Sequence, residues 1–273
     1  MSAAVRGRSV VLAYGDRIAL RASDFEIPQG RVTAVIGPNG SGKSTLFRAV
    51  AGLKDPTWGR LEVLGSSPRS MRRRVAYVLQ ATSVNQAMPV TVGELVTMGR
   101  YAGVGLLGRL SRADRAAVAQ ALERLEIAHL ADRHLGDLSA GQRQRVFVAQ
   151  GLVQDRDLFL LDEPITGLDL VSSERIIDVI AEERGRGGTV ALTTHDLSEA
   201  ALADHVLLLA GRVVVAGPPE RVLAPSHLSE AYGARVFEVD GRLMVDDAAH
   251  DAATSRHVHL DRSARLPSPP RSR

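Results

Sequence analysis

One run of nine residues near the start of the chain reads Gly37-Pro38-Asn39-Gly40-Ser41-Gly42-Lys43-Ser44-Thr45. It matches the pattern G-x-x-x-x-G-K-[ST], in which glycines let backbone N–H groups wrap closely around a phosphate. The run lies after a short β-branched segment, 31–36, and before a helical pattern, 44–53. A strand before the loop and a helix after it are the context that the pattern requires, and a helix N-terminus favours an anion. We therefore expect a nucleotide site, with Lys43 on the β- and γ-phosphates and Ser44 on Mg²⁺.

A second segment completes the expected site. Leu158–Leu161 is a run of apolar residues, typical of a central strand in a parallel sheet, and Asp162 and Glu163 follow it directly. Taken alone, an apolar run that ends in two acids is a weak signal. Together with the glycine-rich loop, it predicts that Asp162 reaches the Mg²⁺ shell and that Glu163 polarises the attacking water as a general base.

The segment from 138 to 142 reads Leu138-Ser139-Ala140-Gly141-Gln142. Ser139 is placed to cap a helix whose N-terminus can face an anion, and in isolation the segment predicts no more than that. Beside the two motifs above, it resembles the signature of ABC ATPases, whose usual form has glycine in place of Ala140. The resemblance implies a homodimer in which Ser139, Gly141 and Gln142 contact the γ-phosphate bound by the opposite subunit. We expect Ala140 to weaken that contact only modestly.

Further landmarks follow in the order that the family shows. Tyr14 matches the aromatic residue that stacks on adenine, and Gln80 matches the glutamine that contacts Mg²⁺ and the attacking water. His195 matches the histidine that contacts the γ-phosphate, and Gly167-Leu168-Asp169 resembles the loop that crosses the dimer interface. Tyr14 also fits an ordinary sheet residue, and a lone histidine after a strand usually has no role, but their spacing favours the family roles. The resemblance covers residues 5–217 and implies that the chain binds and hydrolyses ATP with Mg²⁺.

The same resemblance implies an α/β fold, namely an ABC ATPase nucleotide-binding domain with a RecA-like P-loop core, an antiparallel β subdomain and an α-helical subdomain. Strand-like runs at 9–14 and 18–27 flank a plausible turn at Gly15-Asp16. Helix caps are expected at Thr91, Ser111 and Ser139. We expect one ATPase domain over residues 1–240, with the helical subdomain at about 85–153.

The end of the chain has a different character. Residues 241–273 lose periodicity and finish in a run of proline, serine and arginine, which predicts a disordered tail. The tail contains His250, His257 and His259, which are metal-ligand types. A solvated polar tail is the favoured interpretation, and we do not expect these histidines to form a metal site.

Composition excludes several classes of protein. The 273 residues contain no cysteine, which excludes disulfides, thiolate zinc sites and cysteine nucleophiles and fits a reducing cytoplasm. The net charge is only +3, and arginines are interleaved with acids except at Arg72-Arg73-Arg74 and in the tail, so we expect no nucleic-acid partner. No stretch approaches the roughly 18 apolar residues of a membrane span. We expect a peripheral protein, held at the cytoplasmic face of the cell membrane by a partner.

Two segments point to a subgroup of transporters. Pro89-Val90-Thr91-Val92 and Met98-Gly99-Arg100-Tyr101 resemble segments of ATPases from metal-cation importers, which include zinc, manganese and iron-chelate systems. The resemblance implies an integral membrane permease as partner and, through the permease, an extracytoplasmic metal-binding protein. We expect zinc before manganese as the cargo, and we expect the region 80–100 to dock on the permease.

Other interpretations stay open. Within the metal class, the alternative is a manganese or iron-chelate importer. A soluble ABC ATPase of translation or DNA repair usually carries two cassettes or a long coiled-coil insert, whereas this chain has one cassette and no heptad stretch. A regulator that binds nucleotide without turnover is disfavoured, because Lys43, Glu163 and His195 are all present.

Overall fold

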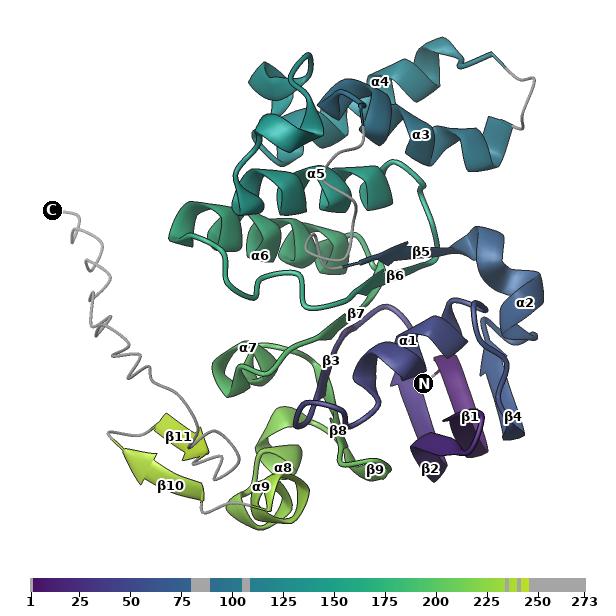
Figure 1. Cartoon of the computed structure of the whole chain (residues 1–273), viewed down its shortest axis with the longest axis vertical. Helices are drawn as coiled ribbons and strands as arrows, with labels where there is room; N and C mark the ends of the chain where they lie inside the picture. Colours follow the sequence, from purple (N-terminus) through teal and green to yellow (C-terminus); the bar gives the residue numbers. More distant parts are fainter. Residues whose placement is uncertain (1, 80–88, 105–108, 234–235, 240–241, 246–273) are drawn as a thin grey trace, which may run out of the picture.

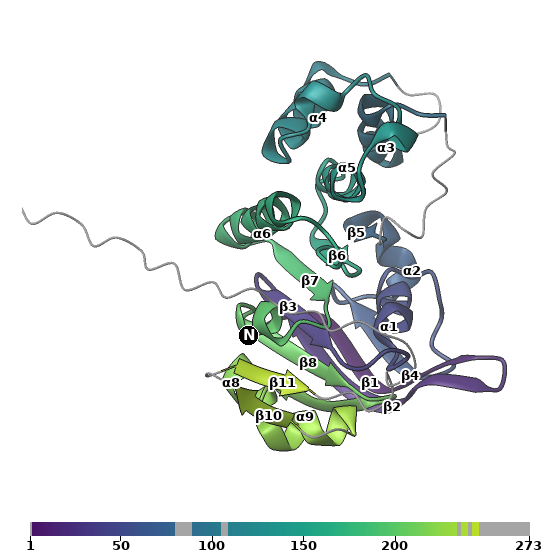
Figure 2. The ribbon, with the colours of Figure 1, turned by 60° about the vertical axis from the view of Figure 1, so that its left-hand side comes forward.

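The computed structural model describes residues 2–79, 89–104, 109–233, 236–239 and 242–245 (Figure 1). It contains two main β-sheets with helices between and around them. Figures 1 and 2 both place helices α3 and α4 at one end of the molecule and helices α8 and α9 at the other. None of the described helices combines the length and the apolar character that crossing a bilayer requires.

The first sheet is antiparallel and has three strands in the order β2-β1-β4. Its strands are β1 (Ala3–Tyr14), β2 (Arg17–Pro28) and β4 (Trp58–Val63). The hairpin predicted around Gly15 is confirmed, with Tyr14 paired to Arg17. Strand β1 begins six residues before the predicted run, and Val5 in that extension is fully buried, whereas β2 exceeds its predicted run by one residue at each end.

The second sheet has six strands in the order β5-β6-β7-β3-β8-β9, of which the last pairs antiparallel and the others pair parallel. Its strands are β3 (Val32–Ile36), β5 (Val75–Val78), β6 (Leu158–Leu161), β7 (Thr189–Thr193), β8 (His205–Leu209) and β9 (Val213–Gly217). Because parallel strands end at the same edge, the residues that follow β3, β6 and β7 gather there.

The parallel sheet is buried on both faces. In β6, Leu158 and Leu160 pack on the side of helix α1 (Lys43–Val50), whereas Phe159 and Leu161 belong to the core on the opposite side. Successive side chains of a strand point to opposite faces, so four apolar residues in a row serve two cores. Helix α1 therefore lies between the two sheets, which fixes the loop at its N-terminus (Figure 1).

The helical part begins with three capped helices, α3 (Val92–Val104), α4 (Arg112–Arg124) and α5 (Ala140–Leu152). The predicted caps are confirmed by backbone N–H groups that donate to a side chain three residues later. Thr91 N donates to Glu94 Oε2 (2.8 Å), Ser111 N to Asp114 Oδ2 (2.9 Å), and Ser139 N to Gln142 Oε1 (3.0 Å). Helix α6 (Leu170–Gly185) packs against α5 and strand β7, and α5 packs against strands β5 and β6.

Several short elements were not predicted from the sequence. They are α2 (Pro68–Met71), α7 (Leu197–Ala201), α8 (Pro219–Val222), α9 (Pro225–Tyr232) and the hairpin of β10 (Val236–Val239) and β11 (Arg242–Val245). Strand β11 falls at the start of the predicted tail and pairs antiparallel with β10. The remainder of that tail, including its three histidines, lies outside the described residues.

Candidate functional site

The glycine-rich loop joins β3 to α1 and has little room for side chains. Gly37 has a φ of 146°, and a Cβ there would collide with Leu209 O. Gly42 has a φ of 105°, and a Cβ there would lie 2.6 Å from Ala19 O. Gly42 is also the N-cap of α1 and provides no side-chain cap, so the first N–H groups of that helix remain for a ligand. The loop therefore has the shape and the donors of an anion cradle.

Two side chains of the loop are consistent with a bound phosphate. Lys43 is buried, and its Nζ donates to the backbone oxygens of Gly37 (2.7 Å) and Pro38 (3.2 Å). Burial lowers the pKa of Lys43, and the carboxylates of Glu163 and Asp162 partly offset this. Ser41 Oγ is buried without a hydrogen-bond partner in the described part of the chain. A phosphate oxygen would supply an acceptor to both groups.

Asp162 stands at the end of β6 and is 7% exposed. Three hydroxyl groups donate to its carboxylate. Ser44 Oγ (3.1 Å) and Thr193 Oγ1 (2.7 Å) bond to Oδ1, and Tyr77 Oη (2.9 Å) bonds to Oδ2. Burial, and then the charge of Asp162, raise the pKa of Tyr77, so its hydroxyl remains a donor. A buried carboxylate held by three neutral donors is a well-ordered anionic ligand.

The same part of the structure tests whether Mg²⁺ fits. Ser44 Oγ and Asp162 Oδ1 are hard oxygen ligands that lie side by side. Among the described residues, no group of three or more His, Cys, Asp or Glu side chains could hold a metal ion. Mg²⁺ usually takes one or two protein ligands and completes its shell with water and substrate phosphates. The residues present fit that mode.

Glu163 follows Asp162 and lines the same cavity as the loop. Its backbone N–H donates to Thr193 Oγ1 (2.8 Å), and its φ is 48°, in the left-handed region. Thr193 thus bonds to both consecutive acids, one through its own hydroxyl proton and one through its lone pair. The cavity has a volume of about 470 Å³ and is lined by Tyr14, Arg17–Ala19, Asn39–Thr45 and Glu163.

Tyr14 lies at the mouth of this cavity and is 47% exposed. Its ring lies 4.1 Å from Lys54 Nζ, measured to the ring centroid, and its hydroxyl accepts from Arg48 Nη1 (3.5 Å). A half-exposed aromatic face beside a phosphate loop is suited to stacking on a base.

Other residues of the expected site lie apart from this cavity. Ser139, Gly141 and Gln142 form the N-terminus of α5 and do not line it. Gly141 is needed for packing, because a Cβ there would collide with Asp169 Oδ2 and Ser172 Oγ at the start of α6. Gln80 lies outside the described residues.

His195 follows β7, is exposed, and has its Nδ1 3.5 Å from Thr166 Oγ1. It does not line the cavity either. Two hydrogen bonds stabilise the turn that carries His195. Thr194 Oγ1 donates to Glu199 Oε2 (2.6 Å) and accepts from Asp196 N (2.9 Å). Burial raises the pKa of Glu199.

Sequence reasoning missed Tyr77, Thr193 and Arg48, which contact the expected site residues. A tyrosine or threonine inside a strand looks like any sheet residue, and Arg48 looks like a surface position of a helix. The weak signal was positional: Tyr77 and Thr193 stand on the strands next to β6 and near their ends.

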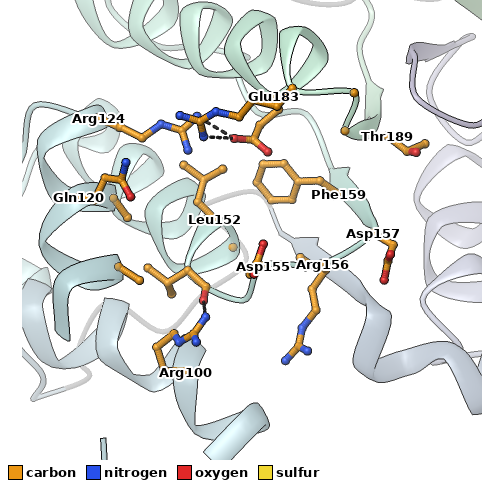
Figure 3. A pocket seen from close by; sticks show the side chains of 18 of the residues that line it. Arg100, Gln120, Arg124, Leu152, Asp155, Arg156, Asp157, Phe159, Glu183 and Thr189 are labelled. Carbon is orange, nitrogen blue, oxygen red and sulfur yellow. Dashed lines mark hydrogen bonds and ion pairs between the residues drawn. The ribbon is translucent and has the colours of Figure 1, made fainter. Parts of the chain in front are cut away.

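A second cavity lies between α4, α5 and α6 and is called the seam cavity here. Its volume is about 560 Å³. Figure 3 shows charged side chains along its walls, with Arg124 and Glu183 facing each other. The charged residues that line it are Arg100, Arg124, Asp155, Arg156, Asp157, Glu183 and Arg186.

Comparison with known proteins agrees with the geometry. The family model described as "ABC transporter" matches residues 20–166. The chain is 39% identical to the zinc transport system ATP-binding protein TroB of Treponema pallidum, over 85% of this chain and 88% of that protein. It is 35% identical to the manganese transport system ATP-binding protein MntB of Bacillus subtilis, over 87% and 96%. Its fold is similar to a solved metal-chelate type ABC transporter in an inward-facing conformation (TM-score 0.76, 26% identity, covering 89% and 96%).

Proposed function

The chain belongs to the ABC transporter family, whose ATP-binding subunits hydrolyse ATP, and on that premise we propose that it energises the import of a divalent metal cation. Zinc is the preferred cargo, and manganese or an iron chelate is the alternative. The observation that carries the proposal is similarity along 85% of the chain to the ATP-binding protein of a zinc transport system. The manganese-system relative, which matches 87% of the chain, is the reason to keep the alternative.

At the phosphate end of the site, we assign a role to each side chain of the loop. Lys43 would exchange its two backbone acceptors for β- and γ-phosphate oxygens, and residues 37–42 and Thr45 would surround the phosphates. Ser44 and Asp162 would hold Mg²⁺, with Gln80 as a third contact. When bound, Mg²⁺ neutralises charge on the β- and γ-phosphate oxygens.

At the water end, we assign Glu163 as the general base. Its carboxylate would accept the proton of the attacking water, while Thr193 holds its backbone through the 2.8 Å bond. Gln80 would orient the same water, and His195 would contact the γ-phosphate. Tyr14 would stack on adenine at the opposite end of the cavity.

We propose that a second copy of the chain completes each site. Ser139, Gly141 and Gln142 are absent from the lining of the cavity, so they serve an adjacent nucleotide only if it belongs to another chain. The N-terminus of α5 supports this role, because its exposed cap presents a positive dipole end. Hydrolysis per subunit should therefore rise with protein concentration, or require the assembled transporter.

We place the permease contact beside α3. A surface hollow of about 710 Å³ lies there, lined in part by Val90, Thr97, Met98 and Tyr101. Met98 and Tyr101 are 44% and 47% exposed, which is high for large apolar side chains. Residues 80–88 of the predicted docking region lie outside the described residues. Docking there would hold the chain at the cytoplasmic face of the membrane, with a metal-binding protein on the other side of the permease.

The test is a gene deletion complemented by three versions of the chain. Wild type, Glu163→Gln and Glu183→Gln are expressed in the deletion strain, and cellular zinc is measured by mass spectrometry under chelation. Glu183 is the matched control, because it receives the same amide substitution in the seam cavity. We expect low zinc in the deletion strain and with Glu163→Gln, and normal zinc with the other two.

Two outcomes would change the assignment. Growth rescue by manganese or an iron chelate alone would replace zinc while keeping metal import. Metal contents that do not respond to the deletion would remove the import proposal and favour a soluble ABC ATPase.

A further inference from the structure

Tyr77 connects the strand next to β6 with the acid at the end of β6. It lies within β5, paired with Leu160, and its ring meets Phe47 of α1 edge-on, with centroids 6.4 Å apart and an interplanar angle of 79°. This packing aims the hydroxyl at Asp162, whose Oδ2 it reaches at 2.9 Å. The ring is thus held by the core while its hydroxyl serves the site.

The hydrogen bonds to Asp162 separate its two oxygens. Oδ1 takes Ser44 and Thr193, whereas Oδ2 takes Tyr77. Ser44 and Asp162 are the metal-holding pair under the proposed function, so the oxygen beside Ser44 is the one on the metal side. Without the phenol, Oδ2 would be a buried acceptor short of a donor, and rotation of the carboxylate would relieve that cost.

We propose that Tyr77 is a positioning residue for Mg²⁺. It fixes the carboxylate plane of Asp162, so that Oδ1 stays beside Ser44 and is ready for the cation before nucleotide arrives. The inference rests on the proposed function, because it assumes that Ser44 and Asp162 hold the metal. It adds a residue of strand β5 to that pair, and this residue acts through Asp162 and does not touch the metal itself.

The test measures the Mg²⁺ requirement of ATP binding and does not depend on turnover. A fluorescent ATP analogue is titrated at a series of Mg²⁺ concentrations, and also in EDTA, with all variants in the Glu163→Gln background. For Tyr77→Phe, the Mg²⁺ concentration at half-maximal effect should rise about tenfold, as expected for loss of one bond to a charged group. Affinity in EDTA should be unchanged, because the nucleotide itself does not contact Tyr77.

Tyr232→Phe is the matched control. It removes a phenol from helix α9, whose residues do not line the nucleotide cavity. Its Mg²⁺ requirement should equal that of the background. A combination with Asp162→Asn checks the route of the effect, since Tyr77→Phe should add nothing once the carboxylate is gone.

Each outcome decides between two claims. An unchanged Mg²⁺ requirement in Tyr77→Phe, or an equal loss of affinity with and without Mg²⁺, would overturn the positioning role and leave the proposed function intact. A full effect that persists in Asp162→Asn would also overturn it. If ATP binding by the background protein showed no dependence on Mg²⁺, the proposed function itself would fail, and this inference with it.

Discussion

The nucleotide cavity and the seam cavity have similar volumes, about 470 and 560 Å³, but their polar groups are arranged in opposite ways. In the seam cavity, charges of opposite sign contact one another. Arg124 bonds to Glu183 at 2.8 Å (Figure 3). It also bonds to Glu182 at 2.8 Å, Arg186 lies 3.1 Å from Glu183, and Arg100 lies 2.7 Å from Asp114.

In the nucleotide cavity, donors face weak or absent acceptors. Lys43 is bonded to two neutral carbonyl groups, Ser41 Oγ has no partner among the described residues, and α1 has no side-chain cap. The paired charges of the seam cavity hold helices together, whereas the donors of the nucleotide cavity are available to bind an anion. Cavity size therefore does not identify the reactive site, whereas the state of its hydrogen-bonding groups does.

The largest expected effect contrasts one glutamate from each cavity. Glu163→Gln should lower ATP turnover about 10²–10⁴-fold, because an amide cannot accept the proton of the attacking water. ATP affinity should change little, since the amide keeps the shape of the side chain. Glu183→Gln should retain turnover. Phosphate release measures both, and equal turnover of the two variants would erase the distinction between the cavities.

The next effect concerns the base-binding end of the nucleotide cavity. Tyr14→Ala should weaken binding of a fluorescent ATP analogue about 5- to 150-fold, because stacking of a base on an aromatic ring is worth about 1–3 kcal/mol. Tyr14→Phe keeps the ring and should bind nearly as well as wild type. If alanine were as good as phenylalanine, Tyr14 would be an ordinary sheet residue.

A smaller effect is expected in the seam cavity, and it is on stability. Arg124→Gln removes two ionic bonds from a side chain that is only 15% exposed. We expect a loss of about 1–2 kcal/mol, which corresponds to a Tm about 2–8 °C lower for a protein of this size. Calorimetry gives the Tm, and ATP affinity at a temperature well below it should be unchanged. A specific loss of ATP affinity would make the seam cavity part of the binding machinery.

The smallest effect has the opposite sign. Arg156 is the exception in the seam cavity, because its Nε is buried without a hydrogen-bond partner among the described residues. Burial, and then the charge of Arg100, lower the pKa of Arg156, which means that these surroundings disfavour the charged guanidinium. Arg156→Gln should leave Tm unchanged or raise it by up to about 3 °C. A clear drop in Tm would mean that this arginine has a partner that matters.

The two cavities also differ in how far sequence predicts them. The loop from 37 to 45 is one contiguous motif and the acids at 162 and 163 are another, and the chemistry of each constrains neighbouring residues, so the sequence alone predicts a nucleotide site there. The helix N-termini could also be predicted from the sequence, because the two residues of a capping box are only three positions apart. The seam cavity joins Arg100, Arg124, Arg156 and Glu183, which share no motif. Its ion pairs depend on how the helices pack against one another, and no local sequence pattern predicts that packing.

Supporting residues of the nucleotide site fall between these cases. Tyr77 and Thr193 bond to Asp162, but each occupies a strand where an aromatic or β-branched residue is the common choice. The residue type alone does not show whether the hydroxyl of a strand tyrosine or threonine contacts the site or has no role in it. Only strand order, β5 beside β6 and β6 beside β7, brings them to the acid.

The backbone of Glu163 has a consequence for the evolution and engineering of this protein. Its φ of 48° is a conformation that costs an ordinary side chain about 1–2 kcal/mol and that glycine or asparagine adopts more readily. Selection for thermal stability alone would therefore favour losing the carboxylate that we assign as the general base for the attacking water. A design procedure that ranks residues by folding free energy should therefore keep glutamate at position 163. The residue that it would otherwise choose there would give a more stable protein that does not hydrolyse ATP.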